Sequence, residues 1–213
     1  MESLREILEG AARGVFPPPD GTTTVVPQDG PRDAGVLAFT AHTVVFTDED
    51  PEWVYETLAA TPSDPLAASM NPYFLHAFME RTGRRTDTVD VMTVAGPLPG
   101  EPGPELTRIE DLTHPRVASS MRRRDEVRAW TAAEGGVLVL GRGIGGRLEA
   151  AVEVTEGVRH RGLGRRLASA ARQLAGGEPV WAQISAGNAR SLRAFQAAGY
   201  RAVGSEALFV AGR

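Results

Sequence analysis

The pattern of hydrophobic and polar positions predicts alternating helices and strands in the first half of the chain. Apolar residues at helical spacing predict three helices, at the N-terminus, over residues 49–60 and over residues 72–82. β-Branched and aromatic residues predict one strand or a hairpin over 36–47, and alternation predicts a strand over 88–94. The stretch 17–35, rich in Pro, Gly, Asp and Thr, is expected to be a loop.

The second half shows the same two periodicities in another order. Strands are expected over residues 106–109, 126–132, 136–140, 147–154 and 179–184, with two short ones near 202–203 and 207–210. Helices are expected over residues 114–124, from 163 to the Gly176–Gly177 pair, and over 188–198. This order predicts an α/β sheet with a meander in its first half.

A stretch rich in Pro and Gly separates the two halves. Residues 95–104, AGPLPGEPGP, contain four Pro and three Gly and predict a domain boundary. We therefore expect an N-terminal α/β extension over 1–95, a linker over 96–104 and a second domain over 105–213.

Charge is unevenly distributed between the halves. The chain has a net charge of −4, but residues 1–104 hold 16 acids and 6 Arg, whereas residues 105–213 hold 11 acids and 17 Arg. All 23 basic residues are Arg, and Cys is absent. This composition excludes disulfides, thiolate metal sites, a Schiff-base lysine and the lysine-containing phosphate loop. Because Arg pairs well with phosphate, an anionic ligand is expected in the second half.

Several partner classes are not expected. The acidic, amphipathic N-terminus has neither the basic start nor the apolar stretch of a signal peptide, and no run approaches the ~18 apolar residues of a membrane span, which predicts a cytoplasmic protein without a membrane partner. No metal is expected, because no metal-spaced pair is formed by the four histidines, His42, His76, His114 and His160. Overall acidity, with few aromatics near Arg122–Arg124, argues against nucleic-acid binding.

Two glycine motifs compete for the role of a phosphate loop. The G-x-G-x-x-G string of Gly141, Gly143 and Gly146 is followed by an alternating, strand-like segment, whereas a dinucleotide loop must open a helix, so a turn is favoured there. The segment 158–164, VRHRGLG, follows a strand and opens a helix. Its glycines allow backbone N–H groups to approach a phosphate, and Arg159, Arg161, Arg165 and Arg166 add charge nearby. The alternative interpretation of this segment is a glycine turn followed by a helix whose arginines face solvent.

Two motifs then carry a resemblance to a known family. Arg159, Gly162 and Gly164 match the pattern Arg/Gln-x-x-Gly-x-Gly/Ala, and a second motif is matched by Asn188, Ser191, Phe195, Gly199 and Tyr200. In this order and spacing the motifs resemble the GNAT superfamily of acyl-CoA-dependent N-acyltransferases, over about residues 105–213. The details look closest to the branch with glycine N-acyltransferase-like C-terminal domains.

The resemblance implies a mixed, mostly antiparallel sheet with splayed central strands flanked by helices. The pantetheine arm of acetyl-CoA would lie between the strands over 147–154 and 179–184, and the pyrophosphate on the amides of 159–164. The implied cofactor-binding residues are Val152, Val154, Arg159, His160, Arg161, Gly162, Leu163, Gly164, Arg165, Asn188 and Ser191. Asn188 is also expected to be a helix cap, Gly199 a helix end and Tyr200 a core aromatic.

The catalytic groups of the family are only partly matched. Phe195 stands where many members place a proton-donating Tyr, and Gln183 where some relatives carry a Glu. Glu149 and Glu153 project from one strand face roughly 13 Å apart, so we expect each to be a base or amine anchor, or instead an Arg-paired or rim carboxylate. Glu206 is a third candidate.

The resemblance implies an N-acetyltransferase that transfers the acetyl group from acetyl-CoA to a primary amine of a small molecule or peptide by direct attack. The alternative is an acyl-CoA-binding module with little turnover, acting as a sensor or scaffold. The acidity of the first half favours a cationic acceptor, or reflects ordinary solubility. A homodimer is also compatible with the sequence.

Overall fold

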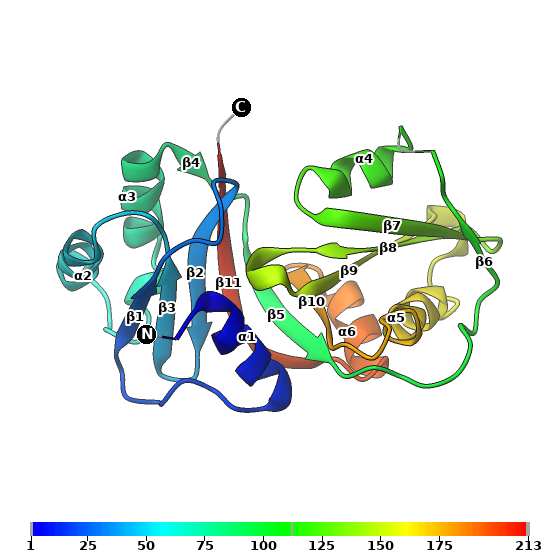
Figure 1. The fold of residues 1–213 in the computed structure, drawn as a ribbon, viewed down its shortest axis with the longest axis horizontal. Coiled ribbons are helices and arrows are strands. Elements are labelled where there is room, and N and C mark those ends of the chain that lie inside the picture. The colour runs from blue at the N-terminus through cyan, green and yellow to red at the C-terminus, as the bar shows by residue number, and fades with distance from the viewer. Residues whose placement is uncertain (1, 112, 212–213) are drawn as a thin grey trace. The chain divides into compact units, whose positions relative to one another are not determined.

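The computed structural model of the chain describes residues 2–111 and 113–211. The chain divides into two compact units, one of Met1–Met92 with Val203–Arg213 and one of Thr93–Ala202 (Figure 1). This division differs from the sequence-based boundary, because the C-terminal strand pairs with strands from the first half of the chain.

The first unit contains a small sheet with the strand order β1-β3-β2-β11. Its strands are β1 (Thr23–Val26), β2 (Asp33–Phe39), β3 (His42–Phe46), β11 (Arg201–Ala211) and the two-residue β4 (Arg84–Arg85), which pairs with the end of β11. β1 and β3 are parallel, and the other pairs are antiparallel. The expected strand or hairpin over 36–47 is a hairpin, but the expected loop over 17–35 also contains β1 and the first residues of β2.

Helices of the first unit begin and end at the residues that their sequence signals indicate. They are α1 (Leu4–Arg13), α2 (Pro51–Ala60), the single turn η1 (Ala68–Met70) and α3 (Pro72–Thr82). Ser3 and Glu6 form a capping box on α1, while Asp50 and Asn71 accept hydrogen bonds from the first turns of α2 and α3. Phe78 of α3 packs 4.6 Å from Phe209, measured between ring centroids.

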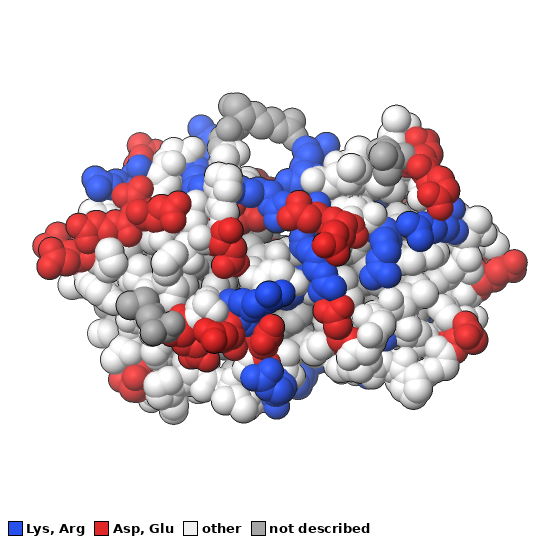
Figure 2. Space-filling view, in the orientation of Figure 1, with Lys and Arg blue, Asp and Glu red and all other residues white. Residues whose placement is uncertain are grey.

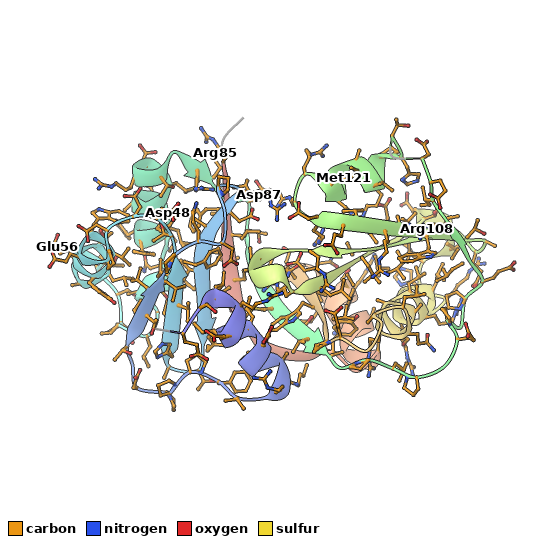
Figure 3. All side chains as sticks on the ribbon, viewed as in Figure 1. Asp48, Glu56, Arg85, Asp87, Arg108 and Met121 are labelled. Atoms are coloured by element: carbon orange, nitrogen blue, oxygen red, sulfur yellow. The ribbon has the colours of Figure 1, made fainter. Side chains whose placement is uncertain are left out.

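The first unit carries a group of acidic side chains on the face drawn in Figure 2. Acidic side chains gather over α2 at the left of Figure 2, and Figure 3 labels Glu56 on that helix. Elsewhere in this unit, a ring nitrogen of His42 lies 2.9 Å from Asp20, which ties the loop before β1 to β3. Hydrogen bonds donated by the hydroxyl and the backbone N–H of Thr22, with a further one donated by a ring nitrogen of His42, lower the pKa of the Asp20 carboxyl to about 2.

The second unit contains a sheet with the order β10-β9-β8-β7-β6. Its strands are β6 (Leu106–Arg108), β7 (Asp125–Ala132), β8 (Gly136–Arg142), β9 (Leu148–Val154) and β10 (Val180–Ser185). β9 and β10 are parallel, and the remaining pairs form the expected meander. A further strand, β5 (Val89–Ala95), crosses the boundary between the units. The two short C-terminal strands expected from the sequence are one continuous strand, β11.

Helices cover both faces of this second sheet. They are α4 (Pro115–Met121), α5 (Leu163–Gln173) and α6 (Ala189–Ala197), with the single turns η2 (Ile144–Gly146) and η3 (Glu156–Val158). On one face Val117 of α4 packs near Ala129 and Val139. On the other face α5 and α6 bury the larger core, which includes Leu140 and Leu167. The mixed α/β, mostly antiparallel fold class expected from the sequence is confirmed.

Every described helix is too short or too polar to cross a membrane. Among residues 2–111 and 113–211, no group of three or more His, Asp or Glu side chains is arranged to hold a metal ion.

Candidate functional site

The parallel strands β9 and β10 pair only at their first residues. Leu148 is in register with Val180 and Glu149 with Trp181, and the pairing between these two fully described strands ends there. Neighbouring strands in a regular sheet stay about 4.8 Å apart and exchange hydrogen bonds along their length. The rest of β9 therefore has one edge that β10 does not cover, and an opening lies between these two strands.

A cavity of about 620 Å³ lies at this opening. It is bounded by the end of β9, the loop after η3, the first turn of α5 and one face of α6. The family resemblance implies eleven cofactor-binding residues, and all but Arg161 line the cavity: Val152, Val154, Arg159, His160, Gly162, Leu163, Gly164, Arg165, Asn188 and Ser191. The structure thus brings together residues from two separate motifs, and the cavity has the size of a small-molecule site.

The loop that closes this cavity has an unusual backbone. His160 and Gly162 both lie in the left-handed region, with φ of 65° and 79°. For His160, a non-glycine residue, this conformation is uncommon. Gly162 is the N-cap of α5, where no side chain accepts a hydrogen bond from the first helical N–H groups. Such N–H groups and the helix dipole together favour an anion at this end.

Gly164 leaves space in the cavity rather than in the protein core. A Cβ atom at this position would meet only Val154 Cγ2 at 3.7 Å and Ala194 Cβ at 3.8 Å, which are ordinary van der Waals contacts. The packing of the protein therefore does not require glycine here, whereas a larger side chain would extend into the cavity that Gly164 lines. The space in front of α5 is available to a ligand.

Arginines line this cavity from three segments of the chain. Arg159 and Arg165 come from the loop and α5, as expected, while Arg190 and Arg193 come from α6. Sequence reasoning missed Arg190 and Arg193. The two are three residues apart in the helix that follows the Asn188 cap, and this spacing places them on one helix face. Arg166 lies outside the lining residues and forms an ion pair with Glu134 instead.

The second motif forms the α6 wall of the cavity. The Asn188 side-chain oxygen accepts a hydrogen bond from the backbone N–H of Ser191 at 3.1 Å, as expected for a helix cap. Phe195 also lines the cavity and packs edge-on against Tyr200, with 4.8 Å between ring centroids. Tyr200 is buried, donates a hydrogen bond to the Ala168 carbonyl at 3.3 Å, and has its pKa raised by burial. It is the core aromatic that the sequence predicts, and Gly199, with φ of 89°, follows the end of α6.

Glu149 lies in a buried cluster of charges at the last position where β9 pairs with β10. Its carboxylate accepts hydrogen bonds from Arg124 Nε at 2.7 Å, Arg147 Nε at 2.8 Å and Gln183 Nε2 at 2.8 Å. Burial raises the pKa of the Glu149 carboxyl, but the charges of Arg124 and Arg147 outweigh this effect and hold the pKa below its ordinary value. The group is thus an ionised, fully engaged carboxylate that joins three segments of the chain.

Glu153 has a different environment on the same strand face. Its side chain is 59% exposed, its carboxylate lies 3.7 Å from Arg116 Nε, and it lines the large cavity. Both glutamates therefore face arginines of α4 or of the segment that follows it. The third candidate, Glu206, is buried on β11 in the first unit, in register with Leu37.

The other glycine motif forms the turn between β8 and β9. A strand follows it, so the turn interpretation is confirmed. A Cβ atom at Gly143 would lie 2.1 Å from Glu149 Oε1, and Gly146 has a φ of 69°. These glycines serve the packing of the Glu149 cluster and the shape of the turn.

No family model and no curated protein matches the sequence. Solved structures do. The chain is similar in structure to GNAT acetyltransferases. The similar structures include a GNAT-family protein from Novosphingobium aromaticivorans (19% identity, TM-score 0.45, covering 62% of this chain and 69% of that one). They also include GCN5-related N-acetyltransferases from Kribbella flavida (15%, 0.44, 68% and 65%) and Sphaerobacter thermophilus (14%, 0.40, 64% and 55%). The chain spans about two thirds or less of the length of the last two.

Proposed function

We propose that the protein is an acyl-CoA-dependent N-acyltransferase that transfers an acetyl group from acetyl-CoA to a primary amine of a small molecule or peptide. The observation that carries this proposal is the cavity at the divergence of β9 and β10, lined by both motifs. An elongated thiol ester with a phosphorylated end fits a site that combines an open strand edge with a basic, glycine-containing loop.

The two ends of the cavity suit the two parts of such a ligand. The first N–H groups of α5, together with Arg159, Arg165, Arg190 and Arg193, would hold the phosphates of the coenzyme. The uncovered edge of β9 at Val152 and Val154 would offer backbone groups to the pantetheine arm, although Arg159 Nε now donates to the Val154 carbonyl at 3.2 Å. Asn188 and Ser191 would contact the arm from α6.

In the reaction, the amine nitrogen attacks the carbonyl carbon of the thioester, a C–N bond forms, and the C–S bond breaks. The amine loses a proton and the sulfur leaves as a thiolate that takes one up. Backbone N–H groups between Val152 and Val154 would stabilise the developing oxyanion. Phe195 cannot donate a proton to the sulfur, so the thiolate would be protonated from another group or from solvent.

The two candidate glutamates divide into different roles in this proposal. Glu153 is exposed and lines the cavity, so it is the better base or amine anchor. Glu149 already accepts hydrogen bonds from three side chains and has a lowered pKa, both of which oppose proton uptake. We assign it to positioning, because it holds Arg124 and Gln183 beside the opening.

The alternative function is an acyl-CoA-binding module with little turnover. Phe195 in place of a proton donor and the fully engaged Glu149 favour this alternative. Both functions predict coenzyme binding, but only the transferase function predicts acetyl transfer.

Release of free thiol from acetyl-CoA, measured across a panel of amines, separates the two. The transferase proposal predicts amine-dependent thiol release that falls at least about tenfold in Glu153→Gln, as expected for loss of a general base. Glu156→Gln, an exposed carboxylate outside the cavity lining, is the matched control. Tight coenzyme binding with no thiol release from any amine would support the binding module instead.

A further inference from the structure

A second, smaller cavity opens on the α4 side of the same unit. Its volume is about 260 Å³, and it is bounded by α4, the segment after α4, and the diverging parts of β9 and β10. Val152, Asn188, Ser191 and Phe195 line both cavities. The two spaces therefore adjoin at the divergence of the strands, which is where the proposed function puts the reacting thioester.

One face of α4, together with the residues that follow it, supplies the polar wall of this smaller cavity. Arg116, Ser119, Ser120 and Arg123 all line it, at spacings of three, four and seven residues that fall on one side of a helical path. Figure 3 labels Met121, the last residue of α4, which does not line the cavity and is exposed. The sequence thus directs cationic and hydroxyl groups toward the sheet and an apolar residue away from it.

The charged side chains that line the smaller cavity are all arginines among the described residues. Arg116, Arg123 and Arg124 line it, and no Asp or Glu does so among the described residues. Arg124 is engaged by the buried Glu149 at 2.7 Å. Arg116 differs, because its Nε atom is buried, has no hydrogen-bond acceptor among the described residues, and lies 3.7 Å from the half-exposed Glu153 carboxylate. A guanidinium N–H with this surrounding can still take an acceptor oxygen.

We propose that this smaller cavity binds an anionic group of the acceptor, so that the preferred acceptor is an amine that also carries a carboxylate or a phosphate. The inference rests on the proposed function, since it concerns the acceptor of that reaction. Arg116 is the principal contact, Arg123 adds charge, and the hydroxyls of Ser119 and Ser120 add further donors. The cationic acceptor suggested by the acidity of residues 1–104 is then refined to an amine with an anionic partner group.

The test compares amines in matched pairs that differ only in the anion. Glycine, β-alanine, 4-aminobutyrate and phenylalanine are each compared with the amine that lacks the carboxylate, and O-phosphoethanolamine is compared with ethanolamine. We expect kcat/KM for thiol release to be at least tenfold higher for the anionic member of at least one pair. The carboxylate pairs and the phosphate pair distinguish the two kinds of anion. Equal or higher kcat/KM for the neutral members throughout would overturn the proposal.

Two variants assign the preference to this cavity. Arg116→Gln is expected to reduce the ratio of the two kcat/KM values toward one, and Arg122→Gln, an exposed arginine outside the lining, is expected to leave that ratio unchanged. Coenzyme affinity serves as the readout for folding and for the larger cavity. An unchanged ratio in Arg116→Gln would contradict the assignment.

If the protein binds the coenzyme but shows no turnover, the transferase function is refuted. The anion site can still be tested on its own. In that case binding of the same anionic amines to the coenzyme complex is measured by saturation-transfer NMR. Binding that is lost in Arg116→Gln supports the anion site, and lack of binding by every anionic probe overturns it.

Discussion

Two glycine-containing segments of the second unit look alike in sequence but differ in what lies next to their glycines. In the turn between β8 and β9, the Glu149 carboxylate occupies the space beside Gly143. A Cβ atom at Gly143 would lie 2.1 Å from that carboxylate. At the start of α5, a Cβ atom on Gly164 would meet nothing closer than 3.7 Å. The first glycine makes room for the protein itself, and the second leaves room for a ligand.

This difference shows how to read a glycine motif in physical terms. A glycine that the packing requires serves stability, and its replacement costs folding free energy. A glycine that the packing does not require, beside a cavity and a helix N-terminus, indicates close approach by something outside the chain. Variants in the first segment should therefore change the free energy of unfolding, and variants in the second should change coenzyme affinity.

The largest effect is expected at the packed glycine. Gly143→Ala would force the Glu149 carboxylate away from Arg124 and Arg147, and disrupting a buried ion pair costs about 3–5 kcal/mol. Denaturant unfolding measures this loss, with Gly187→Ala, whose Cβ would meet nothing within 4 Å, as the matched control. A loss below about 0.5 kcal/mol, the range of neutral surface changes, would contradict the packing role of Gly143.

The opposite pattern is expected at the open glycine. Gly164→Leu fills the cavity and should weaken coenzyme binding at least about 100-fold, or about 2.8 kcal/mol, while the free energy of unfolding changes little. Gly164→Ala should keep or raise stability by up to about 1 kcal/mol, because alanine is the better helix former. Calorimetric binding and denaturant unfolding of both variants measure the separation. If Gly164→Leu unfolds the protein to the same extent as Gly143→Ala, the contrast between the segments is lost.

A smaller effect is expected from the arginines of α6. Replacement of Arg193 by Gln removes one cavity-lining charge and should weaken coenzyme binding about tenfold, or about 1.4 kcal/mol. Arg161→Gln changes an arginine of the loop that does not line the cavity, so its binding constant should stay close to that of the unmodified protein. Calorimetry at low and moderate salt checks both; equal losses in the two variants would mean that only the general charge of the region matters.

The pH dependence of stability is expected to follow the Glu149 cluster. Because the folded-state pKa of Glu149 lies below its ordinary value of 4.5, its stabilisation is complete above that value and is lost as the pH falls through the lowered folded-state pKa. The free energy of unfolding of the unmodified protein should therefore approach that of Glu149→Gln as the pH falls from 7 to 3. A difference that stays constant over this range would show that the carboxylate charge contributes nothing.

Local signals in the sequence predicted much of the fold. The caps at Asp50 and Asn71 and the helix after Gly162 depend on neighbouring residues, and the sequence carries that information directly. The short β1 and the continuous β11 were missed, because their pairing depends on strands far away in the sequence.

The candidate site was predictable to a similar degree. The family resemblance implied that the loop and Asn188 share one site, but Arg190 and Arg193 were not included, because only the folded helix turns them into the cavity. The three side-chain hydrogen bonds to Glu149 could not be predicted either, since Arg124 and Gln183 approach it from other segments of the chain. Sequence alone places two glutamates on one strand face without distinguishing their environments.

The most direct test of the central claim is the electron density of acetyl-CoA in crystals of the protein. We predict that the pyrophosphate lies on the first N–H groups of α5, between Gly162 and Gly164, with the pantetheine arm along the uncovered edge of β9. The thioester should then lie near Val152 and Phe195, which line both cavities. Density for the coenzyme at another place on the chain, with the cavity between β9 and α6 free of it, would contradict the account.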